Sequence, residues 1–357
     1  MRVLHCISTL DVGGSQRQLA LLSRMLPRHG WDVHVACVQD GDLARALDPA
    51  TTIHCVEDWD ARVALRLARL IGRLRPAIVQ TWLLHMDVFG GLAALARDIP
   101  WIATERSSAP GYPRRLSTGM RALLVGRADA LVANSAAGLD LWRRRGRPAT
   151  QRLIRNALDP DATIAVPHLP PGVTVADGSA VILYAGRLVA DKGLRVLLQA
   201  VARIHRDVPA VALLCGTGPL EPELRRLAHD LGIADAVIFA GFVPDMYAVL
   251  RRADIYVSVS LAEGSPNAVQ EAMACGTPVV LSDIAAHREL ADAGAAVFVD
   301  GQDAAAVADA LVACIRDRSA AQSRAARAQT PARAWSPEAM GVEYDRVYHC
   351  VLDNRRS

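Results

Sequence analysis

The sequence has almost no lysine: against 39 arginines it contains a single lysine, Lys192. A lysine ammonium is a compact point charge, whereas the arginine guanidinium is a planar fork, so the two groups are not interchangeable. One ammonium in a chain that otherwise uses arginine indicates a specific need at that position, unless the residue has survived by chance.

Long apolar runs and paired cysteines are also missing. No apolar stretch approaches the length of a membrane span, and the N-terminal MRVLHCISTL is too short for a secretory signal and fits a buried first strand. The seven cysteines are scattered, odd in number and without a CxxC pair. This pattern argues against a disulfide framework or a zinc cluster and predicts a protein of the reducing cytoplasm.

The 357 residues, 52% hydrophobic and 22% charged, are enough for two soluble globular domains. The charge is uneven, because residues 1–160 carry a net +8 and residues 161–357 a net −5. The basic half either faces an anionic surface or substrate, or only carries solvated arginine-rich helices.

Short apolar runs alternate with helix-length amphipathic segments along the chain. Strands are predicted at Val3–Ser8, Val33–Val38, Thr52–Val56, Ala77–Thr81, Trp101–Thr104 and Ala130–Ala133, and in a second series at Val181–Ala185, Ala210–Leu214, Val237–Phe239, Ile255–Ser258, Pro278–Leu281 and Ala296–Val299. This alternation predicts two α/β domains of the Rossmann type, each with a parallel sheet covered by helices on both faces. We place the domains at residues 1–165 and 166–335, a C-terminal packing helix at 336–357, and a linker in the Pro- and Gly-rich segment 156–179.

The residues that follow each strand are the site candidates, because ligands of parallel α/β sheets bind beyond the carboxyl ends of the strands. After the first strand, Gly13 and Gly14 allow positive φ and a close backbone approach. Ser15 is a plausible N-cap of a helix whose N-terminus suits an anion, with a plain strand–helix turn as the alternative. The GxGxxG fingerprint of dinucleotide-binding dehydrogenases is absent.

Two cations stand at the corresponding place in the second series. Arg187 follows a buried strand and Lys192 precedes the next helix, which suits a diphosphate. Gly216 and Gly218 form a tight turn after the following strand. The alternative for Arg187 and Lys192 is a pair of ordinary surface charges, and the alternative for Gly216 and Gly218 is an ordinary turn.

Apolar groups and carboxylates follow later strands. Phe242 and Val243 end a strand where free backbone groups suit a nucleobase, or they belong to the core. In the stretch EGSPNAVQEAMACGTPVV, Glu263 and Gly264 are expected in a loop. Ser265 and Pro266 suit the N-cap and N1 positions of a helix that runs from about Asn267 to Ala274. The second carboxylate, Glu271, lies in that helix, so the two acids belong to different elements.

Together these motifs resemble the retaining glycosyltransferases of family 4, which have the two-domain GT-B architecture. The matching pieces follow the family's order over nearly the whole chain: the Gly-Gly turn, AGRL…DKG, CGTGP, GFVPD and EGSPNAVQEAMACGTPVV with its two glutamates. The resemblance implies an α/β fold of two Rossmann-like domains whose parallel sheets face each other across a cleft. It also implies transfer of a hexose-type sugar from a nucleotide-diphosphate sugar, such as a UDP- or GDP-sugar, to a hydroxyl group.

The resemblance assigns roles to the candidates. Arg187 and Lys192 would neutralise the leaving diphosphate, and Glu263 would orient the sugar or stabilise developing positive charge. Glu271 would accept hydrogen bonds from the ribose. The full set of donor-binding candidates is Gly13, Gly14, Gly216, Gly218, Phe242, Val243, Gly264, Ser265, Pro266, Asn267 and Glu271. Front-face attack assisted by the departing phosphate is the mechanism usually proposed for retaining members.

No metal or other cofactor is expected, because Arg187 and Lys192 supply the charge that a metal would bring. Metal-dependent transferases of the other main architecture use Asp-x-Asp, which occurs here at residues 58–60 and 159–161. Neither copy follows a strand of the donor domain, so we interpret the first as a helix cap and the second as part of the linker.

The first domain departs from the commoner family pattern. Arg106 stands where many members carry a histidine, and Trp82 replaces the first histidine of a THxxHxN motif whose second is His85. We therefore take His85 as the catalytic or acceptor-side candidate, against a histidine at a helix start with no catalytic role. Glu105 and Arg106 are secondary candidates.

The resemblance also implies a carbohydrate or lipid-linked acceptor, assembly of a bacterial surface glycan, and no nucleic acid. Basic stretches such as Arg143–Arg145 would let the first domain contact the inner face of the cytoplasmic membrane, or are simply solvated. Two other classes remain open: a nucleotide-sugar 2-epimerase of similar shape, and a non-catalytic nucleotide-sugar-binding protein.

Overall fold

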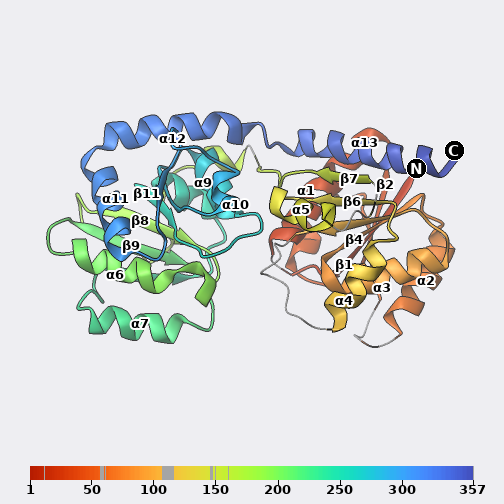
Figure 1. Ribbon diagram of the computed structural model, residues 1–357, viewed down its shortest axis with the longest axis horizontal. Coiled ribbons are helices and arrows are strands. Elements are labelled where there is room, and N and C mark those ends of the chain that lie inside the picture. The colour runs from red at the N-terminus through yellow and green to blue at the C-terminus, as the bar shows by residue number, and fades with distance from the viewer. Residues whose placement is uncertain are drawn as a thin grey trace. The chain divides into compact units, whose positions relative to one another are not determined.

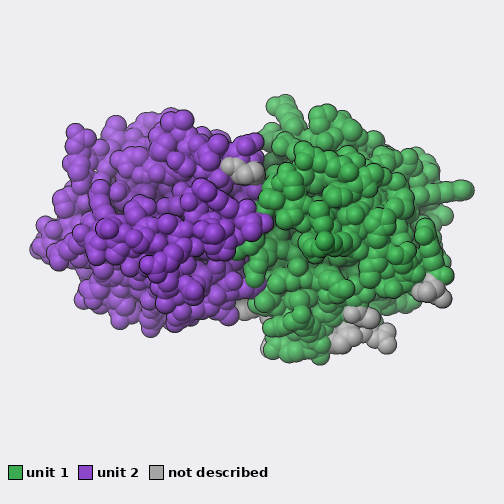
Figure 2. Space-filling view, turned by 90° about the horizontal axis from the view of Figure 1, so that it is seen from above, with its two compact units in different colours: residues 1–157, 335–357 green, residues 158–334 purple. Residues whose placement is uncertain are grey.

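The computed structural model describes residues 1–11, 13–56, 60, 62–106, 116–144, 148, 150–159 and 161–356. The chain divides into two compact units, coloured in Figure 2. The first unit is Met1–Ala157 together with Trp335–Ser357, and the second is Leu158–Ala334.

The first unit is built on a seven-stranded sheet of order β3-β2-β1-β4-β5-β6-β7, in which every pairing is parallel (Figure 1). Its strands are β1 (Arg2–Thr9), β2 (Asp32–Gln39), β3 (Thr52–Cys55), β4 (Ile78–Trp82), β5 (Trp101–Glu105), β6 (Ala130–Ala133) and β7 (Thr150–Leu153). Its α-helices are α1 (Gly14–Met25), α2 (Val63–Leu74), α3 (Leu83–Ala96), α4 (Leu116–Val125), α5 (Ala136–Arg143) and α13 (Pro337–Arg356), with 3₁₀ turns η1 (Leu26–His29) and η2 (Asp42–Ala46).

Both faces of this sheet are buried. Ile7 and Val33 pack in one core with Leu19 of α1 and Tyr344 of α13. Side chains of opposite direction, such as Leu4, pack in a second core with α2 and α3. Because neither face of the central strands meets water, these strands are mainly apolar runs rather than alternating patterns, whereas the edge strands β3 and β7 are partly exposed.

The C-terminal helix belongs to the first unit. Tyr348 of α13 stands edge-on to Trp31, with ring centroids 5.0 Å apart, and its hydroxyl donates to Oε1 of the buried Gln80. Arg355 of the same helix forms ion pairs with Asp98 and Asp129, at 2.7 Å each. These contacts return the end of the chain to the sheet with which it begins.

The second unit has a six-stranded, all-parallel sheet of order β10-β9-β8-β11-β12-β13. Its strands are β8 (Ala180–Ala185), β9 (Ala210–Cys215), β10 (Val237–Gly241), β11 (Ile255–Ser258), β12 (Val279–Ser282) and β13 (Val297–Val299). Its helices are α6 (Leu194–Ile204), α7 (Glu221–Asp230), α8 (Met246–Arg252), α9 (Asn267–Cys275), α10 (Ala285–Arg288), α11 (Ala304–Arg316) and α12 (Arg318–Arg333), with 3₁₀ turns η4 (Ala162–Ile164) and η5 (Ala190–Lys192).

The strand register puts the carboxyl ends of the central strands level with one another. Ala185, the last residue of β8, pairs with Cys215 of β9, and Cys215 pairs with Gly241 of β10. Leu197 of α6 and Leu311 of α11 pack in the core against the sheet. The loops that follow β8, β9 and β10 therefore leave the sheet at one edge.

The predicted fold class is confirmed: two α/β units carry parallel sheets of the Rossmann type. β7 is an addition, because TQRL at residues 150–153 is a short, half-exposed edge strand without an apolar run. The second unit begins at Leu158, earlier than the predicted residue 166. The predicted linker is not free there, since Thr163 O accepts from Arg251 Nη1 of α8 at 3.0 Å.

Candidate active site

The site of the second unit lies where the strand order changes direction. β8 has β9 on one side and β11 on the other, so the chain leaves β8 and β11 toward opposite halves of the sheet. In open parallel sheets a ligand crevice forms outside the carboxyl ends at this point. The two loops that follow are residues 186–193 and 259–266.

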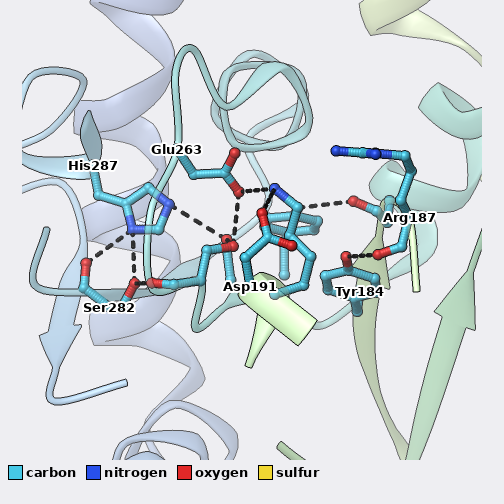
Figure 3. Close-up of polar contacts among 11 residues, drawn as sticks. Tyr184, Arg187, Asp191, Glu263, Ser282 and His287 are labelled. Carbon is cyan, nitrogen blue, oxygen red and sulfur yellow. Dashed lines mark hydrogen bonds and ion pairs between the residues drawn. The ribbon is translucent and has the colours of Figure 1, made fainter. Parts of the chain in front are cut away.

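The loop after β8 carries Arg187 outward. The Tyr184 hydroxyl donates to Arg187 O at 2.9 Å, and Leu188 is fully buried. The side chain of Arg187 is exposed, and its guanidinium has no hydrogen bond or ion pair with any residue that the structure describes. Figure 3 shows this guanidinium turned toward the side of the cluster on which Glu263 lies. A cation so placed is available to an anionic ligand.

Backbone contacts fix the loop of Lys192 against the loop of Glu263. Leu261 N donates to Asp191 O at 2.8 Å. Gly193 has φ +67°, and a Cβ there would lie 2.1 Å from Val259 O. Only glycine meets both conditions, so the two loops hold a constant spacing.

Lys192 and Glu263 form an ion pair between these two loops. Lys192 Nζ lies 2.7 Å from Glu263 Oε1, and the two side chains are 13% and 14% exposed. Asp191 Oδ2 is farther from the ammonium, at 4.0 Å. Glu263 Oε1 accepts a second bond from Ser260 Oγ at 2.7 Å, whereas Oε2 bonds to none of the described residues. One carboxylate oxygen is thus occupied, and the other remains for a ligand.

Polar groups are buried directly beneath Glu263 (Figure 3). Ser282 Oγ donates to Ser260 O at 2.6 Å, and His287 Nδ1 lies 2.8 Å from Ser282 O. Burial lowers the pKa of His287, against opposing effects of the Ser282 carbonyl and the Glu263 charge. The ring is therefore neutral near pH 7.

The second carboxylate lies in α9, as the sequence predicts. Glu271 is 9% exposed. Burial, and then the charge of Glu271, raise the pKa of Cys275 to about 12. The helix begins at Asn267, as predicted, but its N-cap is Pro266 rather than Ser265, and no side chain caps the end. The N-cap residue therefore supplies no side-chain acceptor to the first backbone amide groups of α9. A helix start of this kind suits an anion.

The remaining candidates of this unit divide into backbone and side-chain positions. Gly264 and Ser265 lie between Glu263 and α9. A Cβ at Gly216 or Gly218 would lie 1.9 Å from Gly186 O or 2.3 Å from Leu188 O. Close packing of neighbouring loops is thus sufficient reason for both glycines.

Phe242 and Val243 follow β10. The Phe242 side chain is 57% exposed, and Val243 is 8% exposed. An exposed aromatic ring at a carboxyl edge of a sheet is available for stacking, whereas Val243 packs inward.

In the first unit, the predicted turn has a different geometry. Gly13, not Ser15, is the N-cap of α1, and its φ of −169° is extended backbone that any residue adopts. Neither Gly13 nor Gly14 has positive φ. His85 is exposed in the first turn of α3, two residues after Leu83, which has φ +70°. A leucine in the left-handed region is rare, and such strain is often found at functional sites.

The two secondary candidates are engaged in the packing of the first unit. Glu105 is fully buried and accepts from Arg121 Nη1 at 2.8 Å and from Trp142 Nε1 at 2.9 Å. Arg106 stacks over Trp82 at 4.4 Å and donates to Tyr344 of α13 at 2.9 Å. These contacts argue against an acceptor-side role for either residue.

The Asp-x-Asp motifs and the basic stretch lie partly outside the described residues, which exclude Asp58, Trp59, Pro160 and Arg145. Asp60 accepts from Arg66 Nη2 at 2.8 Å. Among the residues that the structure does describe, no group of three or more His, Cys, Asp or Glu side chains is placed to hold a metal ion. In the same part of the chain, no helix is long and apolar enough to cross a membrane.

Comparison with known proteins identifies the family. The profile described as Glycosyltransferase Family 4 matches residues 12–162, and that described as Glycosyl transferases group 1 matches residues 179–317. A GDP-mannose-dependent alpha-(1-6)-phosphatidylinositol monomannoside mannosyltransferase of Mycolicibacterium smegmatis is 30% identical over 312 residues, 77% of this chain and 75% of that protein. The chain belongs to glycosyltransferase family 4.

This family 4 glycosyltransferase has other relatives. A D-inositol 3-phosphate glycosyltransferase of Geodermatophilus obscurus is 32% identical over 294 residues, which span 70% of this chain but only 62% of that protein. The crystal structure of Anabaena HepE with UDP and glucose has a TM-score of 0.84 at 20% identity, covering 98% of this chain and 100% of its own. Sucrose-phosphate synthase from Thermosynechococcus elongatus has a TM-score of 0.79 at 19% identity, covering 99% of each chain. These likenesses show the GT-B fold.

Several polar residues around Glu263 are not among the sequence candidates. They are Tyr184, Asp191, Ser258, Ser260, Ser282 and His287. One signal was present, because VSVS places two serines at the end of an otherwise apolar strand. The contact of Ser258 with His287, which lies in a helix after a different strand, depends on the strand order and has no local signal.

Proposed function

We propose that this family 4 glycosyltransferase is a retaining enzyme that moves a hexose-type sugar from a nucleotide-diphosphate sugar to an acceptor hydroxyl. The observation that carries the proposal is the Lys192–Glu263 pair, 2.7 Å apart at the switch point of the second sheet, with the exposed Arg187 beside it. Two cations and a carboxylate with one spare oxygen match the two charges that separate when a glycosyl–phosphate bond breaks.

The donor is assigned to the second unit. Arg187, Lys192 and the N-terminus of α9 would bind the diphosphate, and Glu271 the ribose. The exposed ring of Phe242 would stack on the base. This assignment is supported by HepE, whose crystal structures contain UDP and UDP-glucose.

The reaction would use these groups in one sequence. The bond between sugar C1 and the phosphate oxygen breaks, and Arg187 and Lys192 stabilise the negative charge that the diphosphate gains. Glu263 Oε2 would stabilise the positive charge on the sugar. The acceptor oxygen bonds to C1 on the face that the diphosphate leaves, and its proton passes to the departing phosphate oxygen. The anomeric configuration is thereby retained.

We also propose a role in assembling a bacterial surface polysaccharide or lipid-linked glycan, in the cytoplasm at the inner membrane face. Support comes from relatives that include a lipopolysaccharide core biosynthesis glycosyltransferase of Rhizobium meliloti, 32% identical over 210 residues. His85 is the proposed acceptor-side residue. Vesicle pelleting tests the membrane contact: binding to anionic vesicles should weaken when Arg143, the last residue of α5, and the following Arg144 become glutamate, and no binding at low salt would refute it.

Incubation with a panel of UDP-, GDP- and dTDP-sugars tests the reaction. We expect slow donor hydrolysis without acceptor, transfer with one, and a product anomer that matches the donor by NMR. EDTA should leave the rate unchanged, because protein cations neutralise the diphosphate. Interconversion of two nucleotide sugars would instead indicate an epimerase, and donor binding without turnover a binding protein. An inverted anomer would refute retention.

A further inference from the structure

A buried polar group lies under the proposed catalytic carboxylate, in a sheet that is otherwise apolar. Ser258 is 3% exposed, Ser260 1%, Ser282 2% and His287 0%. Removing polar groups from water is unfavourable unless hydrogen bonds replace the lost ones. The cluster therefore requires an account, because apolar residues of similar size would be cheaper to bury.

The bonds of the cluster have a definite direction. His287 Nδ1 donates to Ser282 O, because a carbonyl oxygen only accepts. In the neutral ring Nε2 then accepts, so the Ser258 hydroxyl donates to it across 3.3 Å. Ser282 Oγ donates to Ser260 O at 2.6 Å. The remaining hydroxyl, that of Ser260, donates to Glu263 Oε1 at 2.7 Å.

With this direction, each hydroxyl of the cluster donates its hydrogen to one acceptor. The Ser258 and Ser260 hydroxyls are 3.4 Å apart, but each already donates elsewhere, so their mutual contact is weak. The neutral His287 accepts the Ser258 proton, and Ser258 has no need to compete with Glu263 for the proton of Ser260. The Ser260 hydroxyl is therefore available to donate to the Glu263 carboxylate.

The cluster also joins three elements. Ser258 ends β11, Ser282 ends β12, and His287 lies in α10. The Ser282 side chain binds the backbone of Ser260, so the end of β12 holds the loop that carries Glu263.

We propose that Ser260 is a positioning residue, which fixes Glu263 Oε1 so that Oε2 faces the donor sugar, and that Ser258, Ser282 and His287 hold Ser260 in this orientation. The inference rests on the proposed function for the sugar. The coupling of Ser260 to Glu263 is independent of it. Lys192 alone fixes one oxygen at one point, and a second donor on the same oxygen limits rotation of the carboxylate.

Two measurements test the proposal. The first is an unfolding cycle of Ser260→Ala, Glu263→Gln and the double variant, which needs no substrate. We expect the two single changes to be non-additive, with a deviation of about 2–4 °C in Tm. Additive shifts would overturn the coupling whether or not the protein is an active transferase.

The second measurement is kinetic. Ser260→Ala should lower kcat roughly 10- to 100-fold, as expected for loss of a bond to a charged group, while the Kd for a nucleoside diphosphate stays within about twofold. Ser260→Thr, which keeps the hydroxyl, should regain most of the rate. In the Glu263→Gln background the same alanine change should have little further effect.

Thr277→Val is the matched control. Thr277 is also buried in the second unit, and its hydroxyl donates to Leu250 O at 2.7 Å, but it precedes β12 at the opposite edge of the sheet. We expect a lower Tm and an unchanged kcat. If Ser260→Ala behaves like this control, or lowers kcat and raises Kd together, the positioning role is wrong. An inactive wild-type protein would count against the proposed function, and the unfolding cycle would still decide the coupling.

Discussion

Replacing Lys192 with methionine tests the centre of the site. The change keeps an apolar stem of similar length and removes the ammonium that lies 2.7 Å from Glu263 Oε1. Lys192 is the single lysine of the chain, so no other lysine can substitute for it. The variant loses both the cation that we propose for the leaving diphosphate and the partner of Glu263.

The size of each loss follows from the burial of the pair. Removing one preorganised group that stabilises transition-state charge typically costs about 3 kcal/mol, or 10²–10³ in rate. Breaking a fully buried ion pair costs about 3–5 kcal/mol, and an exposed pair contributes about 0–1. At 13% and 14% exposure, with Ser260 still bonded to Glu263, we expect about 2 kcal/mol of stability. For a unit of this size that is about 4–8 °C in Tm.

Donor hydrolysis at saturating and subsaturating donor gives kcat and kcat/KM, and calorimetry gives Tm. Arg195→Ala is the control, since it removes one cation from the same segment of chain. Arg195 is 47% exposed and pairs with Glu223 on the surface, so we expect activity close to that of the wild type and a Tm change near zero.

A wild-type Tm together with a kcat/KM within about threefold of the wild type in Lys192→Met would refute both roles of the ammonium. An equal loss of activity in Arg195→Ala would also refute them, because the effect would then be one of net charge. Lys192→Arg separates charge from geometry: a planar fork in place of the ammonium should restore only part of the rate.

Glu271→Gln should raise the donor Kd with little change in kcat, because the residue is assigned to the ribose; a large fall in kcat at unchanged Kd, by calorimetry and steady-state kinetics, would contradict this. Gly193→Ala should lower Tm by several degrees, since its Cβ would lie 2.1 Å from Val259 O at φ +67°. An unchanged Tm would show that the loops of Gly193 and Val259 can move apart without loss of stability. Burial raises the pKa of Asp87 to about 6, against the pull of Arg121. The folded state therefore holds a proton that the unfolded state releases between about pH 4 and 6, so this contribution to stability is lost as pH rises through that range. The wild-type Tm should fall relative to that of Asp87→Asn over this interval, and parallel Tm curves would refute the assignment.

Much of the fold could be predicted from the sequence, because both sheets are buried on two faces. Apolar runs then mark most strands directly, and the sequence predicts twelve of the thirteen strands that the structure describes. β7 is the exception, since TQRL is a half-exposed edge strand whose existence depends on pairing with β6. The division between the two units at Leu158 lies within the predicted linker 156–179, and the proline and glycine content of this segment does not show the contact of Thr163 with α8.

The order of residues in the chain determined which chemical groups are available and which strand each follows. Arg187, Lys192 and Glu263 could be placed at carboxyl strand ends in this way, because every strand of a parallel sheet points the same way. Their mutual distances could not be predicted. Those depend on β8 and β11 being neighbours, although about seventy residues separate them in the chain.

Tertiary structure alone decided which of the described polar residues are engaged by neighbouring side chains and which remain exposed. Glu105 ends β5 and Arg106 follows it, just as Arg187 follows β8, yet Arg121, Trp142, Trp82 and Tyr344 surround them with partners. Arg187 meets no such partner in the described chain. The partners that the packed structure supplies likewise distinguish the serines beneath Glu263 from other buried hydroxyls. The sequence determined the elements and their chemistry because periodicity and residue type act locally. Which groups meet depends on the strand order, because only the packed sheet brings distant loops to one edge.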